Sequence, residues 1–157
     1  MRRIMSVGLV VLALASCASG KEPVHGDAGN RILVRIRTAG GTIELEDLQV
    51  ARTSEAQARG LMGRTSLPQD GGMAFLFDGE TRAGFWMKDT LIPLSILFWR
   101  GDGRIIDILD MRPCRADPCP VYRASAPYVG AIEMNRGAFE RLDVEVGDTL
   151  EYRLLSE

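Results

Sequence analysis

The sequence predicts a mainly β protein, a β-sandwich or barrel of about seven or eight strands with one or two short helices. Apolar residues alternate with polar ones over several short segments, which is typical of strands with one buried face. Glycine-containing turns separate these segments, and one pair of segments follows the pattern of a hairpin. The segments are not separated by long helical patterns, so a parallel sheet is not expected.

The first two strands are predicted by alternation at the start of the folded domain. In ILVRIR, residues 32–37, apolar side chains recur at every second position. In GGTIELEDLQVA, residues 40–51, a turn is followed by a segment with Ile43 and Leu45 on one face.

The segment TSEAQARGLMGR, residues 53–64, predicts the best-defined helix. Ser54 and Gln57 fit a capping box, and Gly60 or Gly63 provides an end. The buried side of this helix is expected to consist of Ala56, Ala58, Leu61 and Met62.

The remaining elements follow from apolar runs and turn chemistry. The run MAFLF follows the turn PQDGG and predicts a buried strand. IPLSILFW and RIIDIL, joined by RGDG, predict a β-hairpin. The C-terminal part is expected to contain the strand YVGAIEMN, the helical turn RGAFERL and a closing strand within DVEVGDTLEYRLL.

The first 16 residues differ from the rest and predict a secretory signal peptide. Arg2 and Arg3 form a basic start, and Ile4–Ala15 is almost wholly apolar. This run is shorter than the about 20 residues that a transmembrane helix needs. Its end, LASC, resembles the lipobox of bacterial lipoprotein precursors, in which the cysteine is lipidated and becomes the new N-terminus. Lipidation of Cys17 is therefore expected; the alternative is an ordinary secreted protein in which Cys17 is incidental.

Residues 17–30 are expected to be the lipidated cysteine and a flexible tether, because they are rich in small and polar residues and lack periodicity. A single β-rich domain would then occupy residues 31–157, outside the cytoplasm and held to a membrane by acyl chains on Cys17. Ala18, rather than Asp, after the cysteine resembles the sorting pattern for the outer membrane if the cell is Gram-negative.

Two cysteines remain, Cys114 and Cys119 in PCRADPC, and they predict a structural disulfide in an oxidising compartment. Closing so short a loop stabilises the fold by roughly 2 kcal/mol. A redox-active pair is one alternative, although redox motifs usually have two intervening residues at a helix start. Zinc is the other, but it needs further ligands, and the single histidine, His25, lies in the tether.

Composition excludes several classes of function. The domain has no histidine, so Ser-His-Asp and Cys-His catalysis are excluded. No phosphate-binding glycine loop or HExxH motif occurs, and neither a cofactor nor a metal is expected. The net charge of −2 and the lack of a basic cluster among the aromatic residues argue against nucleic acid as a partner.

One dense segment, FWMKDTLIPL, and its neighbours provide the candidate binding residues. If the segment is extended, Trp86 and Lys88 share one face with Thr90. Trp86 would then stack on a sugar or an apolar surface while Lys88 donates hydrogen bonds. The strand AIEMN adds two polar residues on one face. The whole candidate surface consists of Arg59, Arg64, Trp86, Lys88, Asp89, Glu133 and Asn135.

Two further interpretations of these residues stay open. General acid–base catalysis needs two groups with separated pKa values, and Lys88, Asp89 or Glu133 supply them if they meet. Alternatively, the aromatic residues are simply core, and the charged residues lie at a solvated strand end.

The motifs RGLMGRTSL, GGMAFLF and FWMKDTLIPL, with the later YVGAIEMNRG and VGD, resemble domain-of-unknown-function family 192. The resemblance extends from about Ile43 to Tyr152, and it implies a compact β-rich domain that is often exported or lipid-anchored. It implies no activity. The cysteine pair before PVY resembles a subset of the family, in agreement with a disulfide.

This chain departs from the family pattern at two positions. Asp89 stands where Asn is usual, and Ser95 stands where Asp is usual. If that second carboxylate were the family's catalytic group, this chain would lack it.

These observations together favour a lipid-anchored binding or accessory domain of the cell envelope, with a glycan or another envelope component as its ligand. A hydrolase or lyase acting on envelope polymers is one alternative, and a thiol–disulfide protein that uses Cys114 and Cys119 is another.

Overall fold

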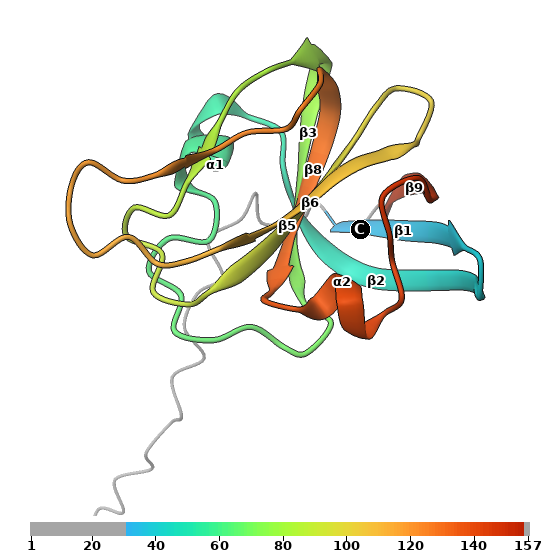
Figure 1. Ribbon diagram of the computed structural model, residues 1–157, viewed down its shortest axis with the longest axis horizontal. Helices are drawn as coiled ribbons and strands as arrows, with labels where there is room; N and C mark the ends of the chain where they lie inside the picture. Colours follow the sequence, from blue (N-terminus) through green and yellow to red (C-terminus); the bar gives the residue numbers. More distant parts are fainter. Residues whose placement is uncertain (1–30, 156–157) are drawn as a thin grey trace, which may run out of the picture.

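The computed structural model describes residues 31–155, and within them it is mainly β, as the sequence predicts (Figure 1). Strand residues account for 49% of the structure and helical residues for 8%. The predicted signal peptide, Cys17 and the tether lie outside the described residues. None of the described helices is long and apolar enough to cross a bilayer.

Seven strands form one sheet in the order β6-β5-β8-β3-β2-β1-β9, in which only β2 and β3 run parallel. Most neighbours are therefore antiparallel, as expected from the absence of long crossover helices. The strands of this sheet are β1 (Arg31–Thr38), β2 (Gly41–Ala51), β3 (Gly72–Thr81), β5 (Leu94–Trp99), β6 (Ile105–Met111), β8 (Tyr128–Asn135) and β9 (Thr149–Leu155).

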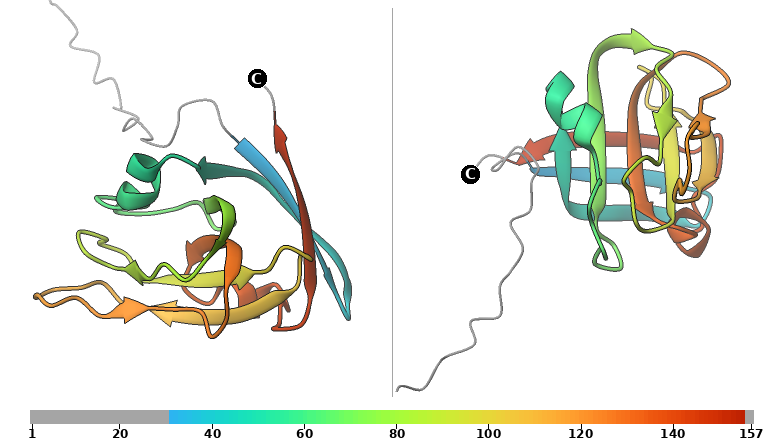
Figure 2. Two further views of the ribbon diagram at one scale, coloured as in Figure 1. Left: turned by 90° about the horizontal axis from the view of Figure 1, so that it is seen from above. Right: turned by 90° about the vertical axis from the view of Figure 1, so that its left-hand side faces the viewer.

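The sheet curls until its two ends meet, so that it resembles a barrel (Figure 2). Arg104, just before β6, bridges to Thr149 at the start of β9, although these strands lie at opposite ends of the sheet order. Gly103 accepts a hydrogen bond from the backbone N–H of Leu150 at 2.8 Å. Gly103 has a φ of 82°, and a Cβ there would clash with the backbone oxygen of Leu150, so glycine is required at this closure. The predicted hairpin formed by β5 and β6 is confirmed.

Two apolar clusters lie on the two faces of the central strands. The first fills the inside of the curled sheet, where α2 (Ala138–Arg141) contributes the buried Phe139. The second covers the outer face and includes Phe75, Phe98 and Met87. Every residue of β5 is consequently buried. Alternation then decides which residue faces which cluster, since successive side chains on a strand point to opposite faces.

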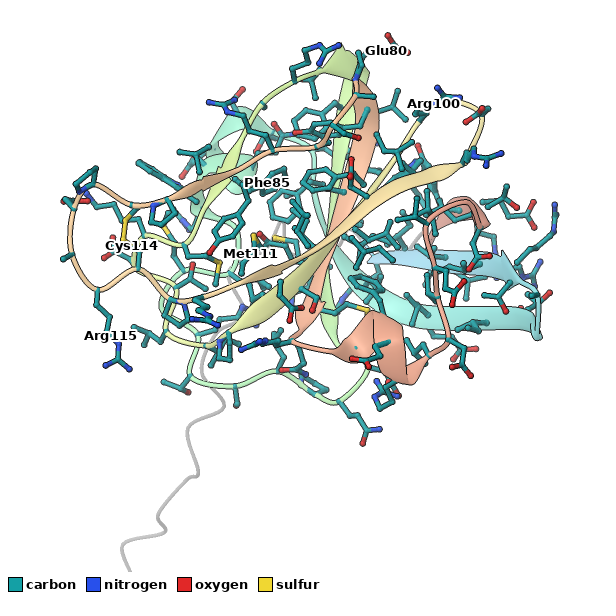
Figure 3. The ribbon with its side chains drawn as sticks, viewed as in Figure 1. Glu80, Phe85, Arg100, Met111, Cys114 and Arg115 are labelled. Atoms are coloured by element: carbon teal, nitrogen blue, oxygen red, sulfur yellow. A yellow bond between two sulfur atoms is a disulfide. The ribbon has the colours of Figure 1, made fainter. Side chains whose placement is uncertain are left out.

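The outer cluster is covered by short elements rather than by another broad sheet. Helix α1 (Ser54–Arg59) lies over it together with a small sheet made of β4 (Phe85–Trp86) and β7 (Val121–Tyr122). The disulfide between Cys114 and Cys119 lies in the loop before β7 (Figure 3), and the N–H of Cys114 donates to the carbonyl of Met87 at 3.2 Å. This loop therefore holds the segment that contains β4 against the rest of the molecule.

The predicted capping box of α1 is wrong by one residue. The N-cap is Thr53, whose hydroxyl accepts from the backbone N–H of Ala56 at 3.1 Å. Gln57, expected to take part in the box, instead donates its side-chain amide to the carbonyl of Leu76 at 2.8 Å. No residue within α1 itself is fully buried, and Leu61, just after it, supplies the buried contact.

Candidate functional site

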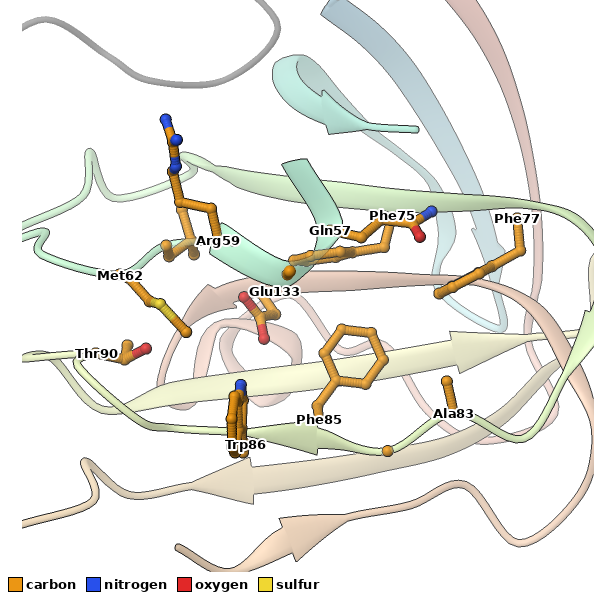
Figure 4. Close-up of a pocket in the computed structure, with 14 residues that line it drawn as sticks. Gln57, Arg59, Met62, Phe75, Phe77, Ala83, Phe85, Trp86, Thr90 and Glu133 are labelled. Carbon is orange, nitrogen blue, oxygen red and sulfur yellow. The ribbon is translucent and has the colours of Figure 1, made fainter. Parts of the chain in front are cut away.

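A pocket of about 300 Å³ opens between the end of α1, strands β3 and β8, and the segment that includes β4 (Figure 4). It therefore lies on the outer face of the curled sheet, above the central strands. Such a volume is at the lower end of the range found for small-molecule sites, so a ligand of about one sugar ring would fit.

Aromatic rings form most of the pocket wall. Phe75 of β3 and Phe85 of β4 meet edge to face with their ring centroids 5.0 Å apart. Phe77 lines the wall two residues further along β3. Trp86 stands at the rim and is 49% exposed, which is unusual for so large an apolar side chain. The pocket thus offers ring faces and edges to a ligand.

Glu133 of β8 provides the one carboxyl group among the residues that line the pocket. It is only 4% exposed, and its side chain points into the pocket (Figure 4). Its partners across the ladder are Met73 on β3 and Ile96 on β5, which are both apolar. Burial raises the pKa of Glu133 to about 8, because water no longer solvates the charged form. The group is therefore mostly protonated at neutral pH.

The carboxyl of Glu133 makes no hydrogen bond or ion pair with any group in residues 31–155. In this part of the chain, every side-chain oxygen or nitrogen that is fully shielded from solvent has a hydrogen-bond partner. Because the oxygens of Glu133 have no partner, they are not fully shielded. The oxygens of Glu133 are therefore reached from the pocket itself. A buried polar group that opens only into a cavity is available to a ligand.

Arg59 also lines the pocket, but its guanidinium does not face the carboxyl of Glu133 (Figure 4). Instead it pairs with Glu55, one helical turn earlier, at 3.0 Å. This pair is exposed to solvent and contributes little stability.

Lys88 and Asp89 do not line the pocket. The ammonium of Lys88 lies 5.9 Å from the centre of the Trp86 ring and 3.6 Å from the carboxylate of Asp117. Trp86 and Lys88, the two residues proposed as a binding platform, are therefore neighbours, but only Trp86 lines the pocket. Asp89 is exposed at a turn with a φ of 54°, and its carbonyl accepts from the N–H of Gly63.

Arg64 and Asn135 have other partners and lie away from the pocket. Arg64 donates to the side-chain oxygen of Gln49 at 2.6 Å, and burial lowers the pKa of its guanidinium. Asn135 donates to the carbonyl of Pro68 at 2.8 Å. Of the seven candidate residues, the structure brings Arg59, Trp86 and Glu133 together in the pocket.

Several pocket residues were not among the candidates from the sequence. Phe75 and Phe77 were assigned to a buried strand, and their shared face on β3 was the available signal. Thr90 was placed on the face of Trp86, and it does line the pocket with a hydroxyl that donates to the carbonyl of Lys88. Met62, expected on the buried side of the first helix, also contributes to the lining.

The arrangement is suited to binding. Acid–base catalysis needs two groups with separated pKa values near the reacting atoms. Lys88 and Asp89 lie outside the pocket, so the pair considered from the sequence does not form with Glu133. Residues 31–155 also contain no group of three or more side chains suited to hold a metal ion.

The comparisons with known proteins agree with this fold. Residues 34–152 match the model of DUF192, a family described as "Uncharacterized ACR, COG1430". The chain belongs to the DUF192 family. It is also similar to a structure of a Novosphingobium aromaticivorans DSM 12444 protein of unknown function, with 32% identity, a TM-score of 0.73, and coverage of 92% of this chain and 99% of that one.

A second similar structure comes from Sinorhizobium meliloti 1021 and is described provisionally as a transcription regulator. It shares 33% identity with this DUF192 chain, with a TM-score of 0.70 and coverage of 78% of this chain and 93% of that one. A search of curated proteins finds no match.

Ser95, where the family pattern usually has Asp, does not belong to the pocket of this DUF192 chain. It is opposite Met134 in the ladder, so it points to the face of β5 away from Glu133. Its hydroxyl donates to Asp110 at 2.6 Å and accepts from the N–H of Gly137 at 2.9 Å. Hydrogen bonds from Ser95 and Arg136 lower the pKa of Asp110. The departure therefore removes no carboxylate from the pocket.

Replacing Ser95 with alanine is expected to lower the free energy of unfolding by about 1–3 kcal/mol. The substitution leaves the N–H of Gly137 without its partner and removes one donor from Asp110. Urea unfolding of the variant and the parent would measure this. Ligand binding in the pocket should be unchanged, and a loss of binding would contradict the placement of Ser95 on the opposite face.

Proposed function

We propose that this DUF192 protein is exported, anchored to a membrane through a lipid on Cys17, and binds a small component of the cell envelope in its pocket. A sugar unit of an envelope glycan is the first candidate. The observation that carries the proposal is an aromatic-walled pocket of about 300 Å³ with a buried carboxyl on its floor and Trp86 half exposed at its rim.

The geometry favours binding over catalysis. Pockets of this kind use apolar and aromatic walls for affinity and a few convergent polar groups for orientation. Here Trp86 and the Phe rings form the aromatic wall, while Glu133 and Thr90 are the polar groups that would orient a ligand. Glu133 is the one carboxyl among the lining residues, and no second acid or base stands beside it there. A binding module is therefore proposed rather than a hydrolase or lyase.

A thiol–disulfide activity has less support. The disulfide lies in a proline-rich loop, with four residues between the cysteines and no helix beginning at either of them, so it does not resemble a redox motif.

A role in transcription also has less support. Control of transcription, given for the Sinorhizobium protein, is not proposed because this chain carries a net charge of −2.

Export and anchoring are supported by the leader sequence and by the disulfide, since disulfides persist in oxidising compartments. Cells that express the protein and are fed a palmitate analogue should label it at Cys17. Cys17→Ser should abolish the labelling, because no other residue can become the lipidated N-terminus. Labelling that persists in the Cys17→Ser protein would refute the anchor.

Trp86→Ala is expected to weaken binding of the envelope ligand about tenfold, because it removes the ring at the pocket rim. Calorimetric titration of the purified protein with glycan and envelope fragments would measure this. Tyr152→Ala is a matched control, since Tyr152 is an aromatic residue on β9 that is 46% exposed and does not line this pocket. If the two substitutions have equal effects, or if neither alters binding, the pocket is not the binding site.

A further inference from the structure

We propose that the ligand of this pocket carries an organic ammonium group, which forms an ion pair with Glu133 on the pocket floor and packs against the surrounding aromatic rings. This inference rests on the proposed function, because it names the chemical class that the same pocket binds. An amino sugar or an amine-bearing envelope component has this chemistry.

The carboxyl of Glu133 has no hydrogen-bond or ion-pair partner among the described residues. Glutamate is almost never fully buried unless it has a partner, yet this side chain is 4% exposed and has none among residues 31–155. Its neighbours across the ladder, Met73 and Ile96, offer no polar group. The carboxyl is accessible only from the pocket, so the missing partner has to enter through the pocket.

The charged groups on the elements around Glu133 are engaged elsewhere or face solvent. From α1, Arg59 pairs with Glu55. From the segment after α1, Arg64 is bonded to Gln49. From the segment after β4, Lys88 pairs with Asp117, and Asp89 is exposed to solvent. These charged groups and their charged partners are Glu55, Arg59, Arg64, Lys88, Asp89 and Asp117. None of the cations in this set compensates Glu133, so a ligand cation would meet no competitor there.

The chemistry of the pocket wall also favours a cation. The faces of aromatic rings attract cations, most strongly where water is excluded, and Phe75, Phe85 and Trp86 all border the pocket. A neutral sugar would stack on these rings equally well and would hydrogen-bond to the protonated acid, but it would not stabilise the ionised carboxylate. A protonated amine would pack against the ring faces and also form an ion pair with the carboxylate.

Binding of an ammonium group would release a proton. Because burial raises the pKa of Glu133 to about 8, the empty pocket holds the protonated acid near neutral pH. The ammonium group stabilises the carboxylate, so Glu133 gives its proton to solvent, and no covalent bond to the ligand forms. Affinity should therefore rise about tenfold per pH unit below about pH 8 and then stay constant until the pH approaches the pKa of the ligand's own ammonium group.

The test is calorimetric titration of the purified protein with cyclohexylamine and with cyclohexanol, which has the same ring but no charge. We expect the amine to bind at least about tenfold more tightly than the alcohol at pH 8, and its affinity to rise about tenfold between about pH 6 and 7. Titrations in two buffers with different ionisation enthalpies should show release of about one proton near pH 7.

Glu133→Gln keeps the size of the side chain and removes its charge, so it should abolish the preference for the amine, its pH dependence and the proton release. Glu46→Gln, at an exposed position of β2, is the matched control and should leave all three unchanged. Thermal melting of both variants shows that they are folded. An amine affinity that neither pH nor Glu133→Gln alters would overturn the inference, and so would equal binding of the alcohol or no binding of the amine.

The same titrations separate this inference from the proposed function. Binding of neutral glycan fragments that depends on Trp86 but not on Glu133 would overturn the ammonium ligand and leave the binding pocket in place. If Trp86→Ala leaves the affinity for both amines and glycans unchanged, the pocket is not the binding site.

Discussion

Glu133→Gln is expected to make the protein more stable at alkaline pH and to change its stability little near pH 5. Burial raises the pKa of Glu133 from its ordinary value of 4.5 to about 8 in the folded state. Between these values the folded protein binds more protons than the unfolded chain. The free energy of unfolding therefore falls as the pH rises through this window.

The stabilisation that the protonated acid provides is complete below about pH 4.5 and is lost as the pH passes through about 8. The loss for such a shift is on the order of 5 kcal/mol. Glutamine cannot ionise, so the variant does not lose stability in this window. Urea unfolding of both proteins at several pH values would measure the difference between them.

The difference in the free energy of unfolding between the variant and the parent separates the effect of Glu133 from the effects of the other titrating groups. The pKa of Asp110 is lowered by Ser95 and Arg136, so its effect on stability appears at lower pH. Burial raises the pKa of Tyr128 to about 12, so its effect appears at higher pH. Glu46→Gln, at an exposed position, should give a flat difference. A flat difference for Glu133→Gln as well would mean that the carboxyl is solvated or paired.

The strands were predictable because their periodicity is local. YVGAIEMN corresponds to β8, Tyr128–Asn135, and ILVRIR lies within β1, where Ile32, Val34 and Ile36 are fully buried. Such patterns depend only on which face of a strand meets a core. The turn at Gly103 was likewise predictable from its residues.

The isolation of Glu133 was not predictable from the sequence. In AIEMN it alternates with Ile132 and Met134, a pattern that ordinarily places the polar residue in solvent. In this fold a second layer, made of α1, β4 and β7, covers that face of the sheet. The layer comes from distant parts of the chain, so nothing next to Glu133 in the sequence indicates that it is buried.

Trp86 and Lys88 were predictable as neighbours because they are two residues apart, and the structure places the ammonium 5.9 Å from the ring centre. The positions of Trp86 and Lys88 relative to Glu133 were not predictable, because they depend on how β4 lies over the sheet. The pairing of β4 with β7 determines this, and β7 follows the disulfide loop.

Phe98→Ala is expected to lower the free energy of unfolding by about 3–5 kcal/mol, since it removes a fully buried ring. Phe98 contacts the ring of Tyr128 at a centroid distance of 4.9 Å and that of Phe85 at 5.6 Å. It therefore supports the pocket wall from below. Urea unfolding should show the loss, and ligand titration should show weaker binding as Phe85 moves into the space.

Leu97→Ala is the control that separates the two effects. Leu97 is the adjacent residue on β5 and is equally buried, but it faces the cluster inside the curled sheet. It should cost about 2–5 kcal/mol of stability and leave ligand affinity unchanged. If both variants weaken binding to the same extent, the two faces of β5 are not independent. If only Phe98→Ala weakens it, the outer cluster acts as the support of the pocket, while the inner one stabilises the sheet on which that pocket lies.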